Sequence, residues 1–235
     1  MNLNEFIEKV KGLGIELSES QINQFNRYYE LLIEYNKVMN LTRIVDYNEV
    51  LEKHFYDSLT MCSKVDLNNS SLVDIGAGAG FPCIPLKIAY PSLKVTVVDS
   101  LAKRMTFLNT VIKELGLKDI ECLAQRGEDF ARNHREQFDF VTARAVARLN
   151  ILDEICLPLV KVNGYFVALK GSDGHLEISE CQNAISKLGG DITQVHEFNL
   201  PSENSKRINI FIKKINKTNT LYPRDFAKIK KNPLK

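Results

Sequence analysis

Three glycines fall within five positions, in the segment Asp74-Ile75-Gly76-Ala77-Gly78-Ala79-Gly80. They follow an apolar run that is typical of a buried strand, and Pro82, a residue that can open a helix, comes soon after them. Glycine at such a turn lets the backbone approach a ligand closely, because no Cβ stands in the way. Asp99 ends the next apolar run, where a carboxylate can accept both hydroxyl protons of a ribose. The pattern predicts a site for a ligand of the adenosine type.

The spacing of the glycines discriminates between such ligands. The dinucleotide fingerprint Gly-x-Gly-x-x-Gly requires glycine at position 81, where this chain has Phe81, so the spacing disfavours pyrophosphate binding. The alternative pattern Asp-x-Gly-x-Gly-x-Gly, which begins at Asp74, resembles motif I of class I S-adenosylmethionine methyltransferases. S-adenosylmethionine carries no phosphate, but it has an ammonium group that we expect Asp74 to attract, directly or through water.

A second acidic feature lies after the third predicted strand, in Arg126-Gly127-Glu128-Asp129. Its place suits binding of the adenine edge through the side chain and the backbone. A helix N-terminus is an equally common reason for two acidic residues at such a place.

Basic residues follow the predicted strands at the edge where parallel sheets bind ligands. They are Lys103, Arg104, Arg126, Arg144, Arg148 and Lys170. Lys103 and Arg104 open a predicted helix, where the helix dipole disfavours cations, so another reason for them is needed. Each one alone is typical of a solvated side chain or a cap. Together, beside a cofactor that is not anionic, they predict an anionic substrate, and RNA phosphates are the first candidate.

Residues that could act as acids, bases or nucleophiles are few. His54 and Asp57 lie one helical turn apart and could reach the site, although the pattern favours a structural hydrogen-bonded pair. The other histidines have no partners for a triad, and no Gly-x-Ser-x-Gly elbow is present. We therefore assign no acid or base and no nucleophile.

The five cysteines are scattered and form no Cys-x-x-Cys pair, so the sequence predicts no metal site and no disulfide framework. We interpret Cys83, beside Pro82, as a packing residue. The chain also has neither the Asn/Asp-Pro-Pro-Tyr loop of amino-group methyltransferases nor a Pro-Cys nucleophile after the fourth predicted strand.

The elements that must position these residues alternate in type after a helical start. Residues 1–66 are predicted to be a helical extension, in which Ser18 and Gln21 form a capping box. Residues 67–216 are predicted to form an α/β methyltransferase domain of the class I, Rossmann-like type, with a doubly wound and mostly parallel sheet. Strands are expected at 72–75, 95–98, 120–124, 138–142, 165–169 and 208–215, and helices at 84–89, 103–115, 151–160 and 176–188. Residues 199–205 look like a linker, and 217–235 form a basic C-terminal tail.

Composition supports a globular protein with an uneven charge distribution. Of its 235 residues 44% are hydrophobic and 26% charged, and neither a membrane-length apolar run nor a signal-peptide pattern occurs, so we expect a cytoplasmic monomer. The net charge of +2 conceals ten Lys and Arg against one acidic residue in 206–235. That end is predicted to meet a polyanion, with Arg224 among its RNA contacts, unless it is only a solubilising end. Removal of 217–235 is expected to leave cofactor affinity unchanged.

Several short motifs together resemble one family over essentially the whole chain. They are Asn40-Leu41-Thr42, His54-x-x-Asp57-Ser58-Leu59, the glycine loop with Phe81-Pro82-Cys83-Ile84-Pro85-Leu86, Asp99-Ser100-Leu101-Ala102-Lys103-Arg104, Arg144-Ala145-x-Ala147-x-Leu149, Leu169-Lys170-Gly171 and Tyr222-Pro223-Arg224. The family is the bacterial RsmG family, also called glucose-inhibited division protein B, whose members often have glycine where Cys83 stands.

The resemblance implies S-adenosylmethionine as methyl donor and, as target, guanine N7 of the nucleotide conventionally numbered 527 in the 530 loop of 16S ribosomal RNA. It implies cofactor contacts by Gly76, Phe81, the Gly127-Glu128 pair and Arg144, with Arg144 in a positioning role. Asp74, Gly78, Gly80 and Asp99 fill general methyltransferase positions. Guanine N7 carries no proton, so its attack on a sulfonium methyl needs no general base.

Three alternatives stay open on the sequence. A nicotinamide-dependent oxidoreductase conflicts with Phe81 at the third fingerprint position. A noncatalytic RNA-binding module explains the basic end of the chain and leaves the glycine loop and Asp99 without a role. A methyltransferase that acts on another RNA base or on a small molecule fits the residues as well, because composition does not select the nucleotide.

Overall fold

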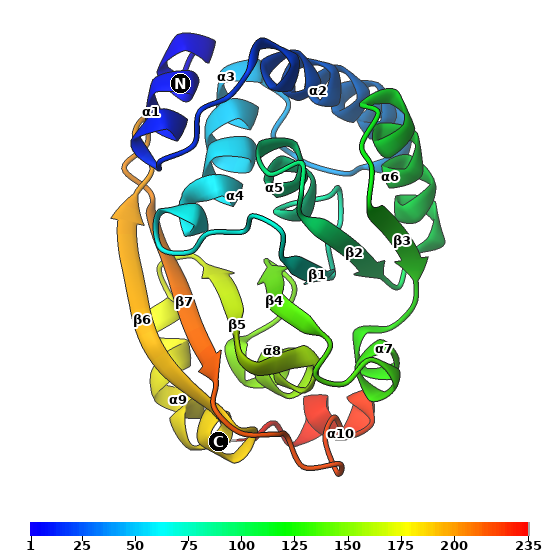
Figure 1. Ribbon diagram of the computed structural model, residues 1–235, viewed down its shortest axis with the longest axis vertical. Coiled ribbons are helices and arrows are strands. Elements are labelled where there is room, and N and C mark those ends of the chain that lie inside the picture. Colours follow the sequence, from blue (N-terminus) through cyan, green and yellow to red (C-terminus); the bar gives the residue numbers. More distant parts are fainter. Residues whose placement is uncertain (235) are drawn as a thin grey trace.

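A seven-stranded sheet forms the centre of the computed structural model, which describes residues 1–234 (Figure 1). The strands are β1 (Ser71–Ile75), β2 (Lys94–Asp99), β3 (Ile120–Ala124), β4 (Phe138–Arg144), β5 (Val160–Lys170), β6 (Gly190–Asn199) and β7 (Lys206–Lys214). Their spatial order is β3-β2-β1-β4-β5-β7-β6, and β7 runs antiparallel to both of its neighbours. The doubly wound, mostly parallel sheet is thus confirmed. Its order reverses between β1 and β4, the point where open α/β sheets bind ligands.

The edge strand β6 is the part of the sheet that the sequence did not predict. Its burial does not alternate cleanly, and the register against β7 shifts between Ile192 and Gln194. The prediction that 199–205 form a linker is wrong. Residues 200–205 connect two paired strands, and the Leu200 amide donates to the Ser205 carbonyl over 3.0 Å.

The helices of the first half of the chain gather on one face of the sheet (Figure 1). They are α1 (Leu3–Gly12), α2 (Glu19–Met39), α3 (Tyr47–Val50), the π-helix η1 (Leu51–Tyr56), α4 (Asp57–Leu59), the 3₁₀ helix η2 (Thr60–Ser63), α5 (Cys83–Ala89) and α6 (Ala102–Glu114). The predicted capping box is present at the start of α2, where the Gln21 amide donates to Ser18 and the Ser18 amide donates to Gln21.

The later helices cover the opposite face (Figure 1). They are α7 (Gly127–Asn133), α8 (Leu149–Cys156), the 3₁₀ helix η3 (Leu157–Leu159), α9 (Gly174–Lys187) and α10 (Phe226–Lys231). The helix predicted over 151–160 therefore starts two residues earlier and ends before β5 begins at Val160. The helix N-terminus offered as the alternative explanation of Glu128 and Asp129 is observed, since both lie in the first turn of α7, whereas the short helix α10 was not predicted.

A row of aromatic rings links the N-terminal helices to the glycine loop. Phe6 of α1 packs on Phe25 of α2 at 5.2 Å between ring centroids, and Phe25 packs on Phe55 of η1 at 5.1 Å. Tyr28 lies 5.2 Å from Phe55 and 5.5 Å from Phe81. The helices thus share one hydrophobic core with this face of the sheet, and the division of the chain at residues 66 and 216 stays a prediction.

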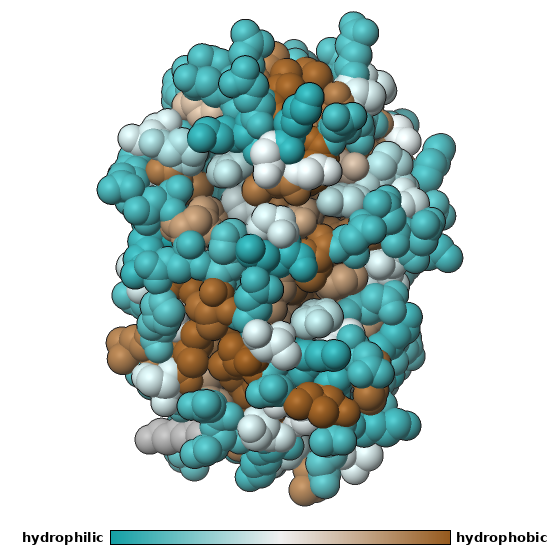
Figure 2. Space-filling view, turned by 60° about the vertical axis from the view of Figure 1, so that its left-hand side comes forward, coloured by the Kyte–Doolittle hydropathy of each residue, from teal (hydrophilic) through white to brown (hydrophobic). Residues whose placement is uncertain are grey.

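Hydrophilic residues cover much of the face shown in Figure 2, and hydrophobic residues form smaller patches between them. None of the helices within residues 1–234 combines the length and the apolar character needed to cross a membrane.

Candidate functional site

Two hollows lie side by side at the carboxyl ends of the central strands. The larger, of about 710 Å³, is here called the basic pocket, and its charged lining residues are Lys53, Asp57, Arg104, Arg144, Arg148, Lys170, Glu177 and Arg207. The smaller, of about 410 Å³, is here called the carboxylate pocket, and it is lined by Asp99, Arg104, Arg126, Gly127, Glu128, Ile151, Leu152, Ile155 and Phe226 among others. Gly76 and residues 145–147 line both, so the two pockets meet at the glycine loop.

The glycine loop is open at one glycine and covered at another. Gly78 has φ +59° and no atom within 4 Å of the place where a Cβ would stand, and its amide donates to Asp99 Oδ2 over 3.1 Å. Gly76 has φ +72°, but a Cβ there would lie 2.5 Å from Val146 Cγ2. A ligand can therefore approach the backbone at Gly78, whereas Val146 packs directly on Gly76.

Asp74 stabilises this loop from the core of the protein, contrary to the prediction that it attracts the ammonium group of a ligand. The residue is fully buried and lines neither pocket. Its two oxygens accept hydrogen bonds from Thr142 Oγ1 at 3.0 Å and from the Cys83 amide at 3.3 Å. Burial raises the pKa of this carboxyl to about 6, and the bonds from Cys83 and Thr142 act in the opposite direction. Asp74 thus joins β1, β4 and the start of α5.

Gly80 is also a packing position. A Cβ at Gly80 would come within 3 Å of Ile84, Leu108 and the Tyr28 hydroxyl, so the glycine leaves room for α2, α5 and α6. The Tyr28 hydroxyl donates to the Ala79 carbonyl over 2.5 Å. The N-terminal helices therefore set the shape of the loop.

Phe81, for which the resemblance implied a cofactor contact, lines the basic pocket and not the carboxylate pocket. Two polar side chains pack against its ring. The His54 ring stacks on it at 4.4 Å and 17°, and the Arg144 guanidinium lies 5.0 Å from the ring centroid. Phe81 therefore orients both side chains through flat contacts.

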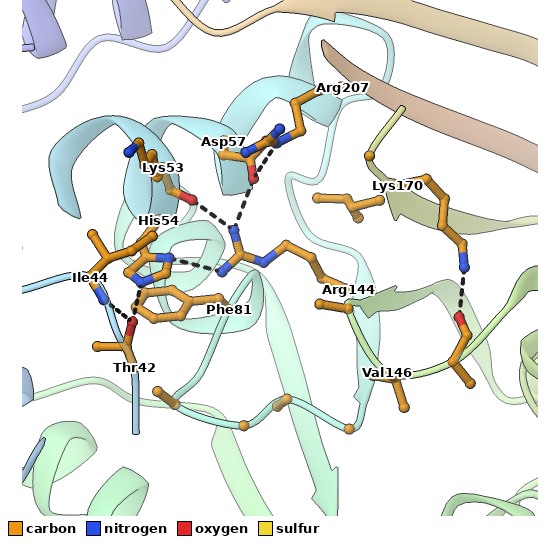
Figure 3. Close-up of a pocket in the computed structure, with 18 of the residues that line it drawn as sticks. Thr42, Ile44, Lys53, His54, Asp57, Phe81, Arg144, Val146, Lys170 and Arg207 are labelled. Carbon is orange, nitrogen blue, oxygen red and sulfur yellow. Dashed lines mark hydrogen bonds and ion pairs between the residues drawn. The ribbon is translucent and has the colours of Figure 1, made fainter. Parts of the chain in front are cut away.

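Arg144 is held in a fixed orientation at the end of β4 (Figure 3). Its Nη1 donates to Asp57 Oδ2 over 3.0 Å and to the Lys53 carbonyl over 3.1 Å, and its Nη2 lies 3.4 Å from His54 Nδ1. Lys53 and His54 belong to the π-helix η1, a rare conformation that is frequent at functional sites. The alternative of a hydrogen-bonded His54–Asp57 pair is not observed, since both residues bind Arg144 instead.

His54 is a neutral ring in this arrangement. Burial and, to a lesser degree, the neighbouring Arg144 lower its pKa to about 3. Its Nε2 lies 2.8 Å from Thr42 Oγ1, which also accepts from the Ile44 amide over 3.0 Å (Figure 3). Arg144 as donor to Nδ1 is consistent with a ring that carries its proton on Nε2.

The carboxylate pocket brings together Asp99, Gly127 and Glu128, as predicted from their spacing. Asp99 is 4% exposed and accepts from the amides of Gly78 and Leu101 and from Arg104 Nη1 at 2.8 Å. Glu128, which is 5% exposed, pairs with Arg126. Two carboxylates and three apolar residues of α8 thus face one hollow, a combination that fits a ribose and an adenine ring.

The cations that were predicted to bind RNA differ in how free they are. Lys103 is exposed and lies outside both pockets, and it makes no ion pair within residues 1–234. Arg126 and Arg148 make ion pairs with Glu128 and Glu180 while about half exposed, and such pairs are weak. Arg104 is bound to Asp99. Lys170 is 8% exposed and pairs with Glu177, so it does not extend into solvent.

The prediction that Arg224 contacts RNA is corrected by its packing, whereas RNA binding by the other cations of the tail stays a prediction. Arg224 donates from its amide, Nε and Nη2 to Glu154, a carboxylate with no exposed surface, over 2.6 to 2.8 Å. Tyr222 and Ile229 are buried, and Phe226 lines the carboxylate pocket under the Arg126 guanidinium at 4.3 Å. The described part of the tail, 217–234, is therefore packed on the protein, in part on α8 and in part on α7, and Lys235 lies outside the described residues.

Several residues of the site were not found from the sequence. Arg207 of β7 reaches Asp57 at 3.4 Å, and Lys53 and Glu177 also line the basic pocket. The excess of cations after residue 206 was the only signal for Arg207. Within residues 1–234, no three His, Cys, Asp or Glu side chains come together as a metal site.

The comparison with known proteins gives the family. The model of the family described as rRNA small subunit methyltransferase G matches residues 21–209. The chain is 51% identical over 236 positions to the ribosomal RNA small subunit methyltransferase G of Staphylococcus epidermidis, covering 100% of this chain and 99% of that one. The enzyme of the same name from Lactobacillus acidophilus is 48% identical, with 100% of both chains covered.

Solved structures agree on the fold. A mutant of the 16S rRNA (adenine(1408)-N(1))-methyltransferase from Catenulisporales acidiphilia superposes with a TM-score of 0.53 at 17% identity, over 68% of this chain and 89% of that one. The YcgJ protein of Bacillus subtilis gives 0.54 at 16% identity, over 69% and 100%. The glycine loop, the switch-point pockets and the full-length similarity lead to the same result: the chain belongs to the rRNA small subunit methyltransferase G family.

Proposed function

We propose that this protein transfers a methyl group from S-adenosylmethionine to N7 of a guanine in 16S ribosomal RNA, the guanosine conventionally numbered 527 in the 530 loop. Membership of the family supports methylation of the small-subunit RNA. The choice of guanine N7 rests on the sequence resemblance. The protein is proposed to act as a monomer in the cytoplasm, where small ribosomal subunits are assembled.

The observation that carries the proposal is the meeting of two chemically different pockets at Gly76. The carboxylate pocket offers Asp99 for ribose hydroxyls and Gly127 with Glu128 for the adenine edge, between apolar residues of α8 and α10. Gly78 leaves open space for a ligand that crosses the loop. When bound, S-adenosylmethionine supplies a methyl group that its sulfonium centre activates. These residues would hold the cofactor with its reactive end toward the basic pocket.

The basic pocket suits an RNA substrate. Arg148 and Arg207 line it and are partly exposed. Arg126 lines the neighbouring carboxylate pocket, and Lys103 lies outside both pockets. Cations at these places can contact phosphates and keep the RNA in register without reading its sequence. A guanine that is unstacked from its loop would enter between them.

No proton has to be removed in this reaction, and the site is built accordingly. His54 is the histidine of the basic pocket, and its lowered pKa together with its contacts to Arg144 and Thr42 keeps it neutral and occupied. Guanine N7 has an in-ring lone pair and no proton. The contribution of the protein is then orientation, with N7 and the methyl carbon about 3 to 3.5 Å apart and in line with the sulfur. Arg144, fixed by Asp57 and Phe81, is the residue placed to orient the groups that meet there.

The test is to map the methylated nucleotide. The protein and isotopically labelled S-adenosylmethionine are incubated in two parallel reactions. One contains small ribosomal subunits and the other deproteinised 16S RNA, and both RNAs lack the modification. We expect label at N7 of one guanine in the 530 loop, detected by strand scission after reduction and aniline treatment. Label on another base, or on a small molecule in a cell extract, would establish methyl transfer with a different target.

A further inference from the structure

Lys170 lies at the end of β5 in the basic pocket, yet its ammonium group faces the protein. Its Nζ donates to the Ala147 carbonyl over 2.7 Å and lies 2.8 Å from Glu177 Oε2. The same Glu177 oxygen accepts from the Leu149 amide over 2.5 Å. The side chains of Lys170 and Glu177 are 8% and 12% exposed. The two residues together thus bind the backbone at 147 and at 149.

The segment that they bind covers the glycine loop. Val146 packs on Gly76 and, with its two neighbours, lines both pockets (Figure 3). Ala145 has φ +56°, in the left-handed region that is unfavourable for a residue with a Cβ. A backbone in such a conformation persists only where its surroundings hold it.

The charge of Lys170 is balanced by Glu177. Asp153 of α8 is also near and fully buried, and its two oxygens have no hydrogen-bond partner in the described residues. Burial raises the pKa of Asp153 well above its usual range, which disfavours a charge on this carboxyl. Removal of either member of the Lys170–Glu177 pair would leave the other as an unpaired buried charge.

We propose that Lys170 and Glu177 form a buried ionic clamp that holds residues 147–149 and thereby seats Val146 over Gly76, at the junction of the two pockets. They are positioning residues for methyl transfer, and Lys170 is not a phosphate ligand. This inference rests on the proposed function, because the junction of the pockets is where the methyl group would pass.

The two roles of Lys170 predict different behaviour of Glu177. If Lys170 bound RNA phosphate, loss of the acidic Glu177 would strengthen RNA binding, and Lys170→Met would reduce the negative slope of log affinity against log salt by about 0.7 to 0.9. If the two form a clamp, Lys170→Met and Glu177→Gln should cause the same defect, and the double variant should be no worse than either.

The experiment measures the clamp directly and through its effect on transfer. Hydrogen exchange in a peptide that covers 145–149 is followed in the wild type, Lys170→Met, Glu177→Gln and the double variant. We expect faster exchange there in all three variants, with the central strands unchanged. Single-turnover transfer at saturating S-adenosylmethionine should fall about 100-fold, the scale of a small misplacement of reacting groups, while the salt slope of RNA binding stays at the wild-type value.

Lys161→Met is the matched control, because Lys161 lies at the other end of β5 and pairs with Asp139 at 2.8 Å. This pair is far more exposed than the Lys170–Glu177 pair. It should change neither exchange at 145–149 nor transfer. Unchanged exchange at 145–149 in the two single variants, or a reduced salt slope in Lys170→Met with normal transfer by Glu177→Gln, would overturn the clamp. If the wild type transfers no methyl group to RNA, the proposed function fails, whereas the exchange data still decide whether the clamp exists.

Discussion

The two pockets differ in the charge that they present, although they share Gly76 and residues 145–147. The carboxylate pocket has two carboxylates, each paired with one arginine, among apolar side chains of α8 and α10; the pairs are Asp99–Arg104 and Glu128–Arg126. The basic pocket has four arginines and two lysines against two acidic residues, Asp57 and Glu177. Both acidic residues of the basic pocket are engaged by its own cations.

This difference explains how one site can accommodate a cationic cofactor and a polyanionic substrate. Carboxylates and apolar surface favour an uncharged adenosine, and clustered guanidinium groups would repel a sulfonium and attract phosphates. Residues 145–147 separate the balanced charges around the adenosine from the excess of cations in the basic pocket. Variants on one side should therefore affect one ligand first.

The largest effect is expected at Gly78, on the cofactor side. A valine at φ +59° is strained and also places a branched side chain in the space left for the ligand, so Gly78→Val should weaken S-adenosylmethionine binding more than about 100-fold, or about 2.7 kcal/mol. Titration calorimetry measures this. Gly116→Val is the matched control, since Gly116 has φ +64°, open space around it and a place in the turn after α6, away from both pockets. Equal losses of affinity in the two variants would mean that strain alone is responsible.

Arg144→Ala should produce the next largest effect, and on the rate. It removes the group that Asp57, the Lys53 carbonyl and Phe81 hold at the junction, so single-turnover transfer should fall roughly 100-fold or more. Arg144→Lys should not restore the rate, because an ammonium group cannot make the set of coplanar hydrogen bonds that a guanidinium makes. Arg27→Ala, which removes exposed pairs with Glu30 and Glu114 outside both pockets, is the control and should stay within a few-fold of wild type. A mild Arg144→Ala phenotype would show that Arg144 is only a structural partner of Asp57.

A smaller effect is expected from Phe226, the residue of α10 that reaches the carboxylate pocket. Phe226→Ala removes one apolar wall and the ring under Arg126, so cofactor affinity should fall about 3- to 10-fold, which corresponds to about 1 kcal/mol. Leu221→Ala is the control, because Leu221 is 73% exposed. Unchanged affinity of the Phe226→Ala protein would restore the expectation that the C-terminal segment is independent of the cofactor site.

This last case also shows what the sequence could and could not predict. β1, β2 and β4 are mostly apolar and almost entirely buried because both faces of a parallel sheet are covered, and such a composition is visible without a structure. The edge strand β6 has one neighbour and a register shift, so its pattern is blurred. Arg224 was interpreted as an RNA contact because its charge was visible in the sequence and its partner, the buried Glu154, was not.

The residues of the site were predictable where they directly follow the strands of the parallel sheet. Gly78, Asp99 and Glu128 stand at ends of strands or in the turns after them, and the parallel sheet brings those ends together. Arg207 and Tyr28 reach the site from an antiparallel strand and from an N-terminal helix. Spacing in the sequence holds no record of such long-range contacts.

The pH dependence gives the smallest expected change, and it concerns the charge on the basic side. The pKa of His54 is lowered to about 3 in the folded protein from an ordinary 6.5. Between these values the unfolded chain binds a proton that the folded chain does not, so His54 contributes stability that is present above about pH 6.5 and is lost as the pH falls. At neutral pH His54 is therefore neutral and has no titration to impose on the reaction.

We accordingly expect the single-turnover rate on small ribosomal subunits to vary less than about twofold between pH 6.5 and 8.5, because neither guanine N7 nor His54 loses a proton in that range. Asp74, with its pKa raised to about 6, is mostly ionised above pH 6.5, and any decline of the rate on further acidification should come from the glycine loop and appear also in cofactor binding. Rates are best compared at saturating cofactor and constant ionic strength, since RNA binding depends on salt. A rate that rises tenfold per pH unit would require a general base, and the basic pocket would then hold a proton acceptor as well as the cations that face the RNA.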